Sequence, residues 1–159
     1  MGRHLTEADF WDQRYAGGRG RRRLWLRRLG RVAEDERGEL WRRILAIPAI
    51  PRASVIELGC APGRILERMA RVAPEFVYHG LDYSAVGLEV CKKALAAAGV
   101  KAELHEGDLW TTELPTKYDI VVSAGLVEHF DSPAEALRRH AAFARAGGWV
   151  VVTTPNWTR

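Results

Sequence analysis

A loop bounded by two glycines carries the clearest chemical signal in the sequence. It runs Gly59-Cys60-Ala61-Pro62-Gly63 and follows a short apolar stretch that is predicted to be a strand. Glycine lets backbone amides approach a ligand closely and tolerates φ values that other residues avoid. Backbone N–H groups at the start of the helix that follows favour a negatively charged group. The loop therefore predicts a ligand site at the end of this strand.

Three acidic residues accompany the loop. Glu57 precedes Gly59 by two residues, Asp82 ends the second predicted strand, and Asp108 follows the third. An acid at the end of the second strand, roughly 20 residues past the loop, is placed to accept hydrogen bonds from ribose hydroxyls. Glu57 suits a ligand with an ammonium or sulfonium charge, because hydrogen bonds to charged groups contribute about 1.5–3 kcal/mol each. Asp108 can accept a hydrogen bond from an adenine amino group.

Further segments extend this pattern over nearly the whole chain. They are Phe10-Trp11-Asp12-Gln13-Arg14-Tyr15, Glu57–Arg64, Leu81–Ser84, Gly107-Asp108, Tyr118–Ser123 with Gly125–Phe130, and Gly147–Trp149. Their order and joint spacing resemble the class I S-adenosylmethionine-dependent methyltransferases that act on small molecules. The resemblance implies a methyltransferase with S-adenosylmethionine as cofactor, S-adenosylhomocysteine as product and a small-molecule acceptor.

The resemblance also assigns residues to the cofactor. Gly59 and Gly63 would meet the methionine portion, Asp82 the ribose, and Asp108 with Leu109 the adenine. The full set that it implies is Glu57, Gly59, Cys60, Ala61, Gly63, Arg64, Asp82, Tyr83, Gly107, Asp108, Leu109, Ser123, Ala124 and Gly125.

The histidines offer one candidate catalytic group. His129 follows the fourth predicted strand, near the expected acceptor. It is either a general base, since imidazole titrates near neutral pH, or a packed loop histidine. His4, His79, His105 and His140 show no metal-ligand spacing, so no metal site is predicted.

Other residues keep two interpretations. Arg64 contacts the cofactor carboxylate or lies exposed on its helix. Cys60 is expected to be a small core residue rather than a nucleophile. Trp11, Trp25 and Trp41 are expected in the core or in a lid rather than in an acceptor platform.

Two departures from the family pattern bear on function. Ala61 stands where the family's loop usually has its middle glycine, and the chain stops at Arg159, after the fifth strand of a sheet that has seven in the family. Val150-Val151-Val152 would then form an exposed edge, a template for another chain. We expect either a homodimer through that edge or a truncated protein.

The alternative function is a cofactor-binding or interaction protein without turnover. A nicotinamide oxidoreductase is disfavoured by Glu57 and by the missing third glycine.

The elements that would position these residues alternate from residue 53 onward. Short apolar runs predict strands at 54–59, 76–81, 101–104, 118–123 and 149–154, and one-sided apolar patterns predict helices at 64–72, 84–98 and 133–146. Ser84 is an expected N-cap and Gly99 an expected helix stop. This alternation predicts an α/β, doubly wound, Rossmann-like parallel sheet of about five strands with helices on both faces.

Residues 1–52 are expected to form a basic helical lid on the core at 53–159, within one domain. They hold 13 arginines against 7 acidic residues. A short helix is predicted from a Thr6 N-cap to about Tyr15. A longer helical stretch is predicted from about Arg22, and it continues through Leu45 after a charged interruption. The run Arg19–Arg23 lacks interleaved aromatic side chains, so nucleic acid is not the expected partner.

Length and composition agree with a cytoplasmic enzyme. The 159 residues suffice for one domain with a core, and 47% are hydrophobic and 28% charged, close to the globular average. No apolar run approaches the ~20 residues of a membrane span, and no signal peptide is evident. Cys60 and Cys91 are expected to be free thiols.

Overall fold

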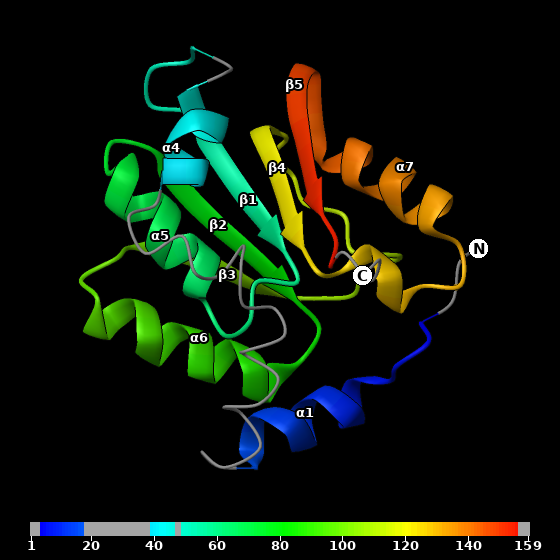
Figure 1. The fold of residues 1–159 in the computed structure, drawn as a ribbon. Helices are drawn as coiled ribbons and strands as arrows, with labels where there is room; N and C mark the ends of the chain where they lie inside the picture. Colours follow the sequence, from blue (N-terminus) through cyan, green and yellow to red (C-terminus); the bar gives the residue numbers. More distant parts are fainter. Residues whose placement is uncertain (1–3, 18–38, 47–48, 156–159) are drawn as a thin grey trace.

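The computed structural model describes residues 4–17, 39–46 and 49–155, and it shows a sheet between two layers of helices (Figure 1). Five parallel strands pair in the order β3-β2-β1-β4-β5. They are β1 (Ser54–Leu58), β2 (Val77–Asp82), β3 (Ala102–Glu106), β4 (Tyr118–Ala124) and β5 (Ala144–Thr153). The predicted doubly wound α/β fold is therefore confirmed.

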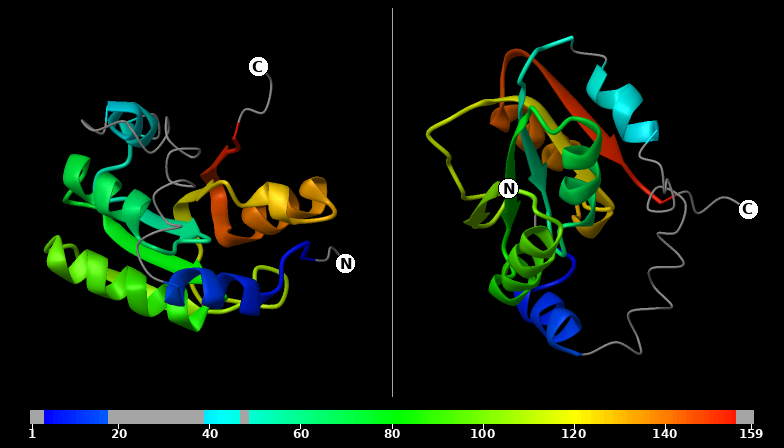
Figure 2. Two further views of the ribbon diagram at one scale, coloured as in Figure 1. Left: turned by 60° about the horizontal axis from the view of Figure 1, so that its bottom comes forward. Right: turned by 90° about the vertical axis from the view of Figure 1, so that its left-hand side faces the viewer.

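The helices cover both faces of the sheet. They are α1 (Ala8–Ala16), α4 (Glu39–Ala46), α5 (Arg64–Val72), α6 (Ala85–Ala97) and α7 (Pro133–Phe143), with a short 3-10 helix η1 (Val127–His129). α4, α5 and α6 pack on one face and α7 on the other, while α1 lies below the carboxyl ends of the strands, against α6 (Figure 2). None of these described helices is long and apolar enough to cross a membrane. The helix predicted from about Arg22, the Arg19–Arg23 run and Trp25 lie outside the described residues.

Neighbouring residues of the central strands point to opposite faces of the sheet. In β1, Val55 belongs to the core under α5 and α6, and Ile56 to the core under α7. In β4, Val122 and Val121 divide in the same way, and all four side chains are fully buried. Because both faces are covered, these strands appear in the sequence as continuous apolar runs.

Two element boundaries differ from the prediction by more than two residues. α7 ends at Phe143 rather than near Ala146, and β5 begins at Ala144 rather than at Trp149. Ala144 has an extended backbone and pairs with Tyr118 of β4. Strand pairing thus replaces the last predicted helical turn, and the register then shifts before Trp149 pairs with β4.

Serine side chains cap the starts of α6 and α7, and at α6 this confirms the predicted N-cap Ser84. Ser84 and Ser132 each accept a hydrogen bond from a backbone amide in the first turn of the helix that follows. At α1 the prediction of Thr6 as the N-cap is wrong, because Glu7 holds that position. The Thr6 hydroxyl instead accepts a hydrogen bond from Trp11 Nε1 at 3.1 Å.

A buried carboxylate supports the loop between β1 and α5. Glu57 is 3% exposed, and its side chain accepts a hydrogen bond from the Leu66 backbone N–H at 3.2 Å. Gly63 is the N-cap residue of α5 and has no side chain with which to cap the helix. Glu57 therefore satisfies one of the free amides of the first turn from outside the helix. Burial raises the pKa of the Glu57 carboxyl well above its usual range.

Replacing Glu57 with glutamine tests this burial. Because the pKa of Glu57 is higher in the folded than in the unfolded protein, the wild type loses stability as the pH rises above the unfolded value of about 4.3. The Glu57→Gln variant lacks this titration, so its free energy of unfolding relative to wild type should rise as the pH increases above about 4.3. Urea unfolding at several pH values measures the difference. Glu89→Gln, at an exposed position of α6, is the control, and a pH-independent offset for Glu57→Gln would contradict the prediction.

Candidate cofactor site

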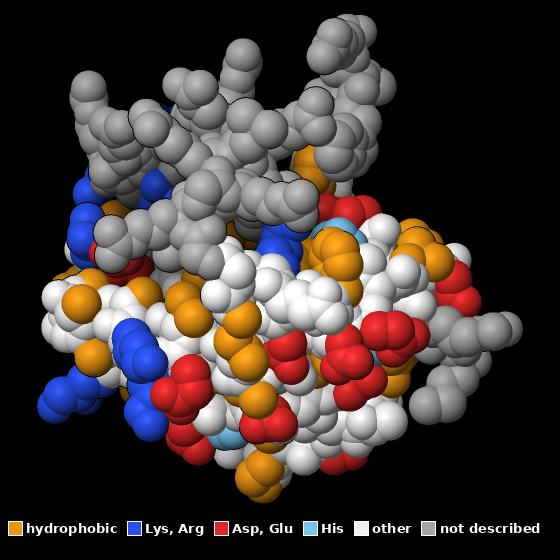
Figure 3. Space-filling model, turned by 90° about the horizontal axis from the view of Figure 1, so that it is seen from below, with side chains coloured by type: hydrophobic (Ala, Val, Ile, Leu, Met, Phe, Trp, Pro, Cys, Tyr) orange, Lys and Arg blue, Asp and Glu red, His pale blue; other side chains and the backbone are white. Residues whose placement is uncertain are grey.

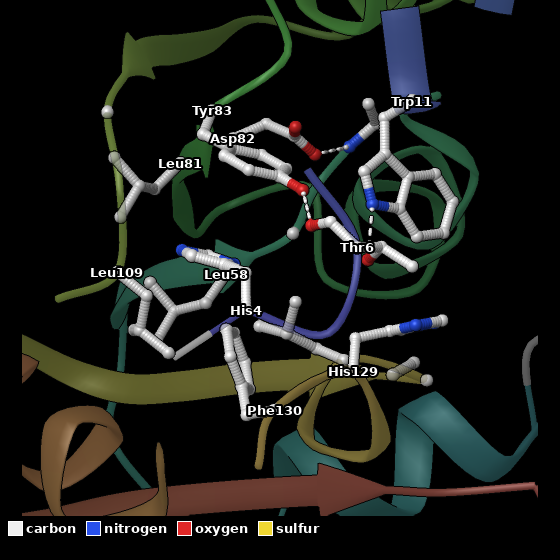
Figure 4. A pocket seen from close by; sticks show the side chains of 16 residues that line it. His4, Thr6, Trp11, Leu58, Leu81, Asp82, Tyr83, Leu109, His129 and Phe130 are labelled. Atoms are coloured by element: carbon white, nitrogen blue, oxygen red, sulfur yellow. Dashed lines mark hydrogen bonds between the residues drawn. The ribbon is translucent and has the colours of Figure 1, made fainter. Parts of the chain in front are cut away.

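A pocket lies at the carboxyl edge of the sheet, where the strand order reverses (Figure 4). β1 stands between β2 and β4, and ligands of open parallel sheets bind beside such a point. The lining comes from the strand ends, from η1 and from the N-terminal segment. It consists of His4, Thr6, Trp11, Leu58, Gly59, Ala61, Leu81, Asp82, Tyr83, Gly107, Leu109, Ala124, Gly125, Leu126, His129 and Phe130.

The pocket brings together most, but not all, of the predicted site residues. Those that line it are Gly59, Ala61, Asp82, Tyr83, Gly107, Leu109, Ala124, Gly125 and His129. Those outside the lining are Glu57, Cys60, Gly63, Arg64, Asp108 and Ser123. The lining residues that the sequence prediction missed are His4 and Thr6 and the apolar Leu58, Leu81 and Phe130, whereas Leu126 ends the Ser123–Leu126 stretch that the resemblance places near the sulfonium.

Asp82 is the acidic residue of the pocket lining. It is 8% exposed, and its two carboxylate oxygens accept hydrogen bonds from the N–H groups of Ala61 and Ser84, each at 3.0 Å. Burial raises the pKa of Asp82, and these backbone hydrogen bonds oppose the rise. A carboxylate offers about four lone-pair sites, so Asp82 keeps acceptor capacity for the hydroxyl groups of a ligand.

Two glycines leave room beside the pocket. Gly59 has φ +72°, and a Cβ built on it would lie 3.0 Å from a methyl carbon of Leu126. A Cβ on Gly107 would lie 2.2 Å from the hydroxyl oxygen of Thr112. A side chain at either position would be strained or would clash with the neighbouring side chain, so both positions require glycine.

An N-terminal strap, residues 4–7, crosses the pocket (Figure 4). The N–H of Leu5 donates to the carbonyl of His129 at 2.8 Å, and the Tyr83 hydroxyl donates to the carbonyl of Thr6 at 2.7 Å. His4 also forms an isolated antiparallel bridge with Phe130. The sequence signal for this arrangement is the Phe10–Tyr15 segment directly after the strap, but the contacts themselves join distant parts of the chain.

His4 places a flat ring inside the pocket. Its imidazole stacks on Tyr83, with ring centroids 4.9 Å apart and 11° between the planes, and it packs against Phe130 at 5.0 Å. Its Nε2 donates a hydrogen bond to a carboxylate oxygen of Asp108 at 2.9 Å. The space between Tyr83 and Asp108 therefore accepts a planar nitrogen heterocycle, and an adenine has the same character.

Ser123 lies behind the pocket wall and holds β4 to α7. His140 Nδ1 donates to the carbonyl of Ala136 at 2.7 Å, so its Nε2 carries a lone pair and accepts the Ser123 hydroxyl proton at 2.8 Å. Ser123 and His140 are fully buried, and burial lowers the pKa of His140. Ser123 therefore lies outside the pocket lining, whereas Ala124 and Gly125, predicted with it, belong to the lining.

Cys60 and Trp41 are core residues, as expected. Both side chains are almost completely buried among the apolar residues under α5. The two cysteines are free, and interaction with Cys91, followed by burial, raises the pKa of the Cys60 thiol well above its usual value. A thiol held neutral in this way is a poor nucleophile. Trp11 instead lines the pocket, in agreement with its expected place in a lid.

His129 lies at the end of η1 and faces the pocket. Its ring meets Trp11 edge to face, with centroids 5.0 Å apart and 88° between the planes (Figure 4). Burial lowers the pKa of His129, although Glu128 opposes this effect. The imidazole is therefore neutral at physiological pH and can accept a proton. Its packing against Trp11 agrees with the interpretation as a packed histidine, and its place in the pocket lining allows the interpretation as a general base.

The carboxyl edge of the sheet carries much acidic surface (Figure 3). Seen from this side, acidic side chains lie over the middle and right of the described surface, and the described basic side chains lie mainly at the left.

Comparison with known proteins gives a consistent family. Residues 55–148 match the family described as a methyltransferase domain. The ubiquinone biosynthesis O-methyltransferase of Bordetella bronchiseptica is 32% identical over 104 residues, which cover 64% of this chain and 42% of that protein. The enzyme of the same name from Nitrosospira multiformis is 31% identical over 104 residues, 64% of this chain and 43% of its own length. The chain thus spans less than half the length of these curated relatives.

Solved structures share the fold at lower identity. A putative S-adenosylmethionine-dependent methyltransferase from Methanococcus maripaludis has a TM-score of 0.66 at 20% identity, over 94% of this chain and 64% of its own. The sugar N-methyltransferase KedS8 from Streptoalloteichus has a TM-score of 0.65 at 23% identity, over 85% of this chain and 53% of its own. At these identities the likeness shows the fold alone. Because the family match covers more than half of the sequence, the chain belongs to the methyltransferase-domain family.

Proposed function

We propose that this protein binds S-adenosylmethionine and transfers its methyl group to a small-molecule acceptor. The observation that carries the proposal is Asp82, a buried carboxylate that faces the pocket beside the glycine loop. Relatives named as O-methyltransferases and neighbours solved with S-adenosylhomocysteine support it.

Each portion of the cofactor has a complementary part of the pocket. Asp82 would accept the ribose hydroxyls. The adenine would stack on Tyr83 near Leu109 and donate to Asp108, the place that His4 takes in this structure. The methionine portion would lie along the loop that begins at Gly59. Glu57 and the predicted loop residues outside the pocket lining would hold this loop in position.

When bound, S-adenosylmethionine supplies a methyl group attached to a sulfonium sulfur. The thioether that leaves this methyl group needs no further activation. The contribution of the chain is therefore alignment. Rigid strand ends hold the pocket walls, and a fixed orientation of two reactants contributes several kcal/mol, up to about 7–11, to lowering a reaction barrier. The strap and Trp11 would exclude water from the aligned groups.

The acceptor would enter beside Leu126, His129 and Phe130, where the lining is largely apolar. The names of the relatives and neighbours include both O- and N-methyltransferases, so we propose an oxygen or nitrogen nucleophile on a partly apolar small molecule. His129, neutral at physiological pH, would accept the proton that such a nucleophile releases.

Calorimetric titration with S-adenosylmethionine tests cofactor binding. Asp82→Asn removes the carboxylate but keeps the shape, so it should weaken binding by about tenfold or more, given about 1.5–3 kcal/mol for a hydrogen bond to a charged group. His4→Ala should strengthen binding by roughly threefold to tenfold, because the imidazole then no longer competes with the adenine for Tyr83 and Asp108. Asp9→Asn, at an exposed position of α1, is the matched control and should leave the affinity unchanged.

Each outcome of this titration has a clear meaning. Failure of the wild type to bind would refute the proposed function. Equal affinities for Asp82→Asn and wild type would remove Asp82 from the ribose site. Binding of a nicotinamide dinucleotide in place of S-adenosylmethionine would favour the oxidoreductase alternative.

Replacing His129 with glutamine tests the proposed general base. The rate of methyl transfer should fall by about 100-fold or more while the affinity for S-adenosylmethionine is kept. Because the pKa of His129 is lowered, the wild-type rate should stay constant on lowering the pH to the ordinary imidazole value of about 6.5 and decline only below it. Product release from a panel of phenols and amines measures the rate. An unchanged rate would leave His129 a packing residue, and cofactor binding without transfer to any acceptor would favour the non-catalytic alternative.

We also propose that the protein is cytoplasmic and that two copies of it pair along the free edge of β5. Among the described strands β5 pairs with β4 alone, and its Trp149 and Val150 are 43% and 38% exposed. An open apolar edge of this kind is a template for another strand. Light scattering at micromolar concentration should give twice the chain mass, and Val150→Lys should reduce it to one copy. A monomeric mass for the wild type would contradict the pairing.

A further inference from the structure

Two histidines and a glutamate meet on the sheet outside the pocket. His79 belongs to β2, and Glu103 and His105 to β3. His79 and Glu103 are register partners, and His105 lies two residues after Glu103, so all three side chains share one face. Potential ligand atoms of the three residues lie within 4.8 Å of one another. None of the three lines the pocket.

The distances among the ligand atoms are longer than ordinary hydrogen bonds. His79 Nδ1 lies 3.5 Å from His105 Nε2 and 3.5 Å from a carboxylate oxygen of Glu103, and His105 Nε2 lies 3.8 Å from the other oxygen. Good hydrogen bonds to nitrogen donors span about 2.7–3.2 Å. Ligand atoms around a tetrahedral Zn²⁺, with bonds of about 2.0–2.2 Å, stand about 3.3–3.6 Å apart. The triangle therefore fits a shared ion better than it fits hydrogen bonds.

The two rings turn nitrogen atoms toward each other rather than their carbon edges. The imidazole planes are 6° apart and their centroids are separated by 5.8 Å, yet the two nitrogens approach to 3.5 Å. Two nitrogen ligands of one tetrahedral ion stand about as far apart as these two atoms do.

The surroundings shield the histidines and leave the carboxylate accessible. The side chains of His79 and His105 are 14% and 20% exposed, whereas that of Glu103 is 67% exposed. The ring of Tyr118 packs edge-on against His79 at 4.9 Å. An ion could thus enter from the side of Glu103 and keep a water molecule on that side.

We propose that His79, Glu103 and His105 bind a Zn²⁺ ion with solvent as the fourth ligand. Two imidazoles and one carboxylate are a common zinc ligand set with an open position. The ion would join β3, which pairs with β2 alone among the described strands, to its neighbour. Gly107 and Asp108 directly follow β3, so the ion would also hold that wall of the pocket in place. The proposal does not depend on the proposed methyl transfer.

Titration of the chelator-treated full chain with zinc chloride tests the site. Wild type should bind one equivalent with micromolar or tighter affinity, and the ion should raise its melting temperature. Glu103→Gln should weaken binding by about tenfold or more, and His105→Asn should abolish it, as expected for loss of a ligand. Glu106→Gln makes the same charge change on the same strand, on the opposite face, and should bind zinc like wild type.

Two results would overturn the proposal. The first is absence of zinc binding to the wild type when its circular dichroism spectrum shows the folded state. The second is equal zinc affinity in wild type, Glu103→Gln and His105→Asn, because the ion would then lie elsewhere. Cobalt(II) in place of zinc supplies a second readout, because tetrahedral cobalt(II) absorbs visible light strongly. This absorption is expected for wild type and not for a folded His105→Asn variant.

Discussion

The pocket depends on how the loop after β1 is tied to the end of β2. The N–H groups of Gly59 and of the next residue donate to the carbonyl of Leu81 at 2.8 and 3.2 Å, and the N–H of Ala61 donates to Asp82 at 3.0 Å. Three successive loop amides are thus anchored on two successive residues of β2. Gly80 makes this approach possible, because a Cβ there would lie 2.6 Å from the sulfur of the loop cysteine. Parallel pairing of β1 with β2 is therefore what builds the ligand site.

The same anchoring requires buried acids, which do not favour stability. Burial raises the pKa of both Glu57 and Asp82, so keeping either one ionised costs free energy in the folded protein. Of the two acids, only Asp82 lines the pocket, and a perturbed acid in a pocket is typical of functional sites. It agrees with the proposed ligand, whose ribose carries hydroxyl groups.

The N-terminal residues complete a site that the sheet leaves open. The Tyr15 hydroxyl donates to the carbonyl of Ala61 at 3.0 Å, and Ser84 hydrogen-bonds to Asp12, so α1 is fixed on both the loop and α6. The strap then crosses from α1 to η1 and places His4 against Tyr83. The result is a wall built from residues far apart in the sequence, whose position decides how much of the space beside Tyr83 and Asp108 is free.

The sequence by itself determined the strands, the order of elements and many of the residues that line the pocket. Continuous apolar runs identify β1 and β4 because both faces of the sheet are covered, and the Gly59–Gly63 loop and Asp82 follow strand ends directly. These are local features, and local propensity and periodicity are enough to find them. The early end of α7 was not predictable in this way, because strand pairing with β4 overrides a helical pattern.

Only the tertiary structure decided what faces what. Glu57 accepts a hydrogen bond from the first turn of α5, and the Ser123 hydroxyl donates to His140 outside the pocket lining. His4 lies in the pocket, stacked on Tyr83. The spacing of His79 and His105 shows no ligand motif, yet the register of β2 with β3 brings them together around Glu103. The physical reason is that strand register and side-chain direction follow from the packing of the whole sheet, which no local segment encodes.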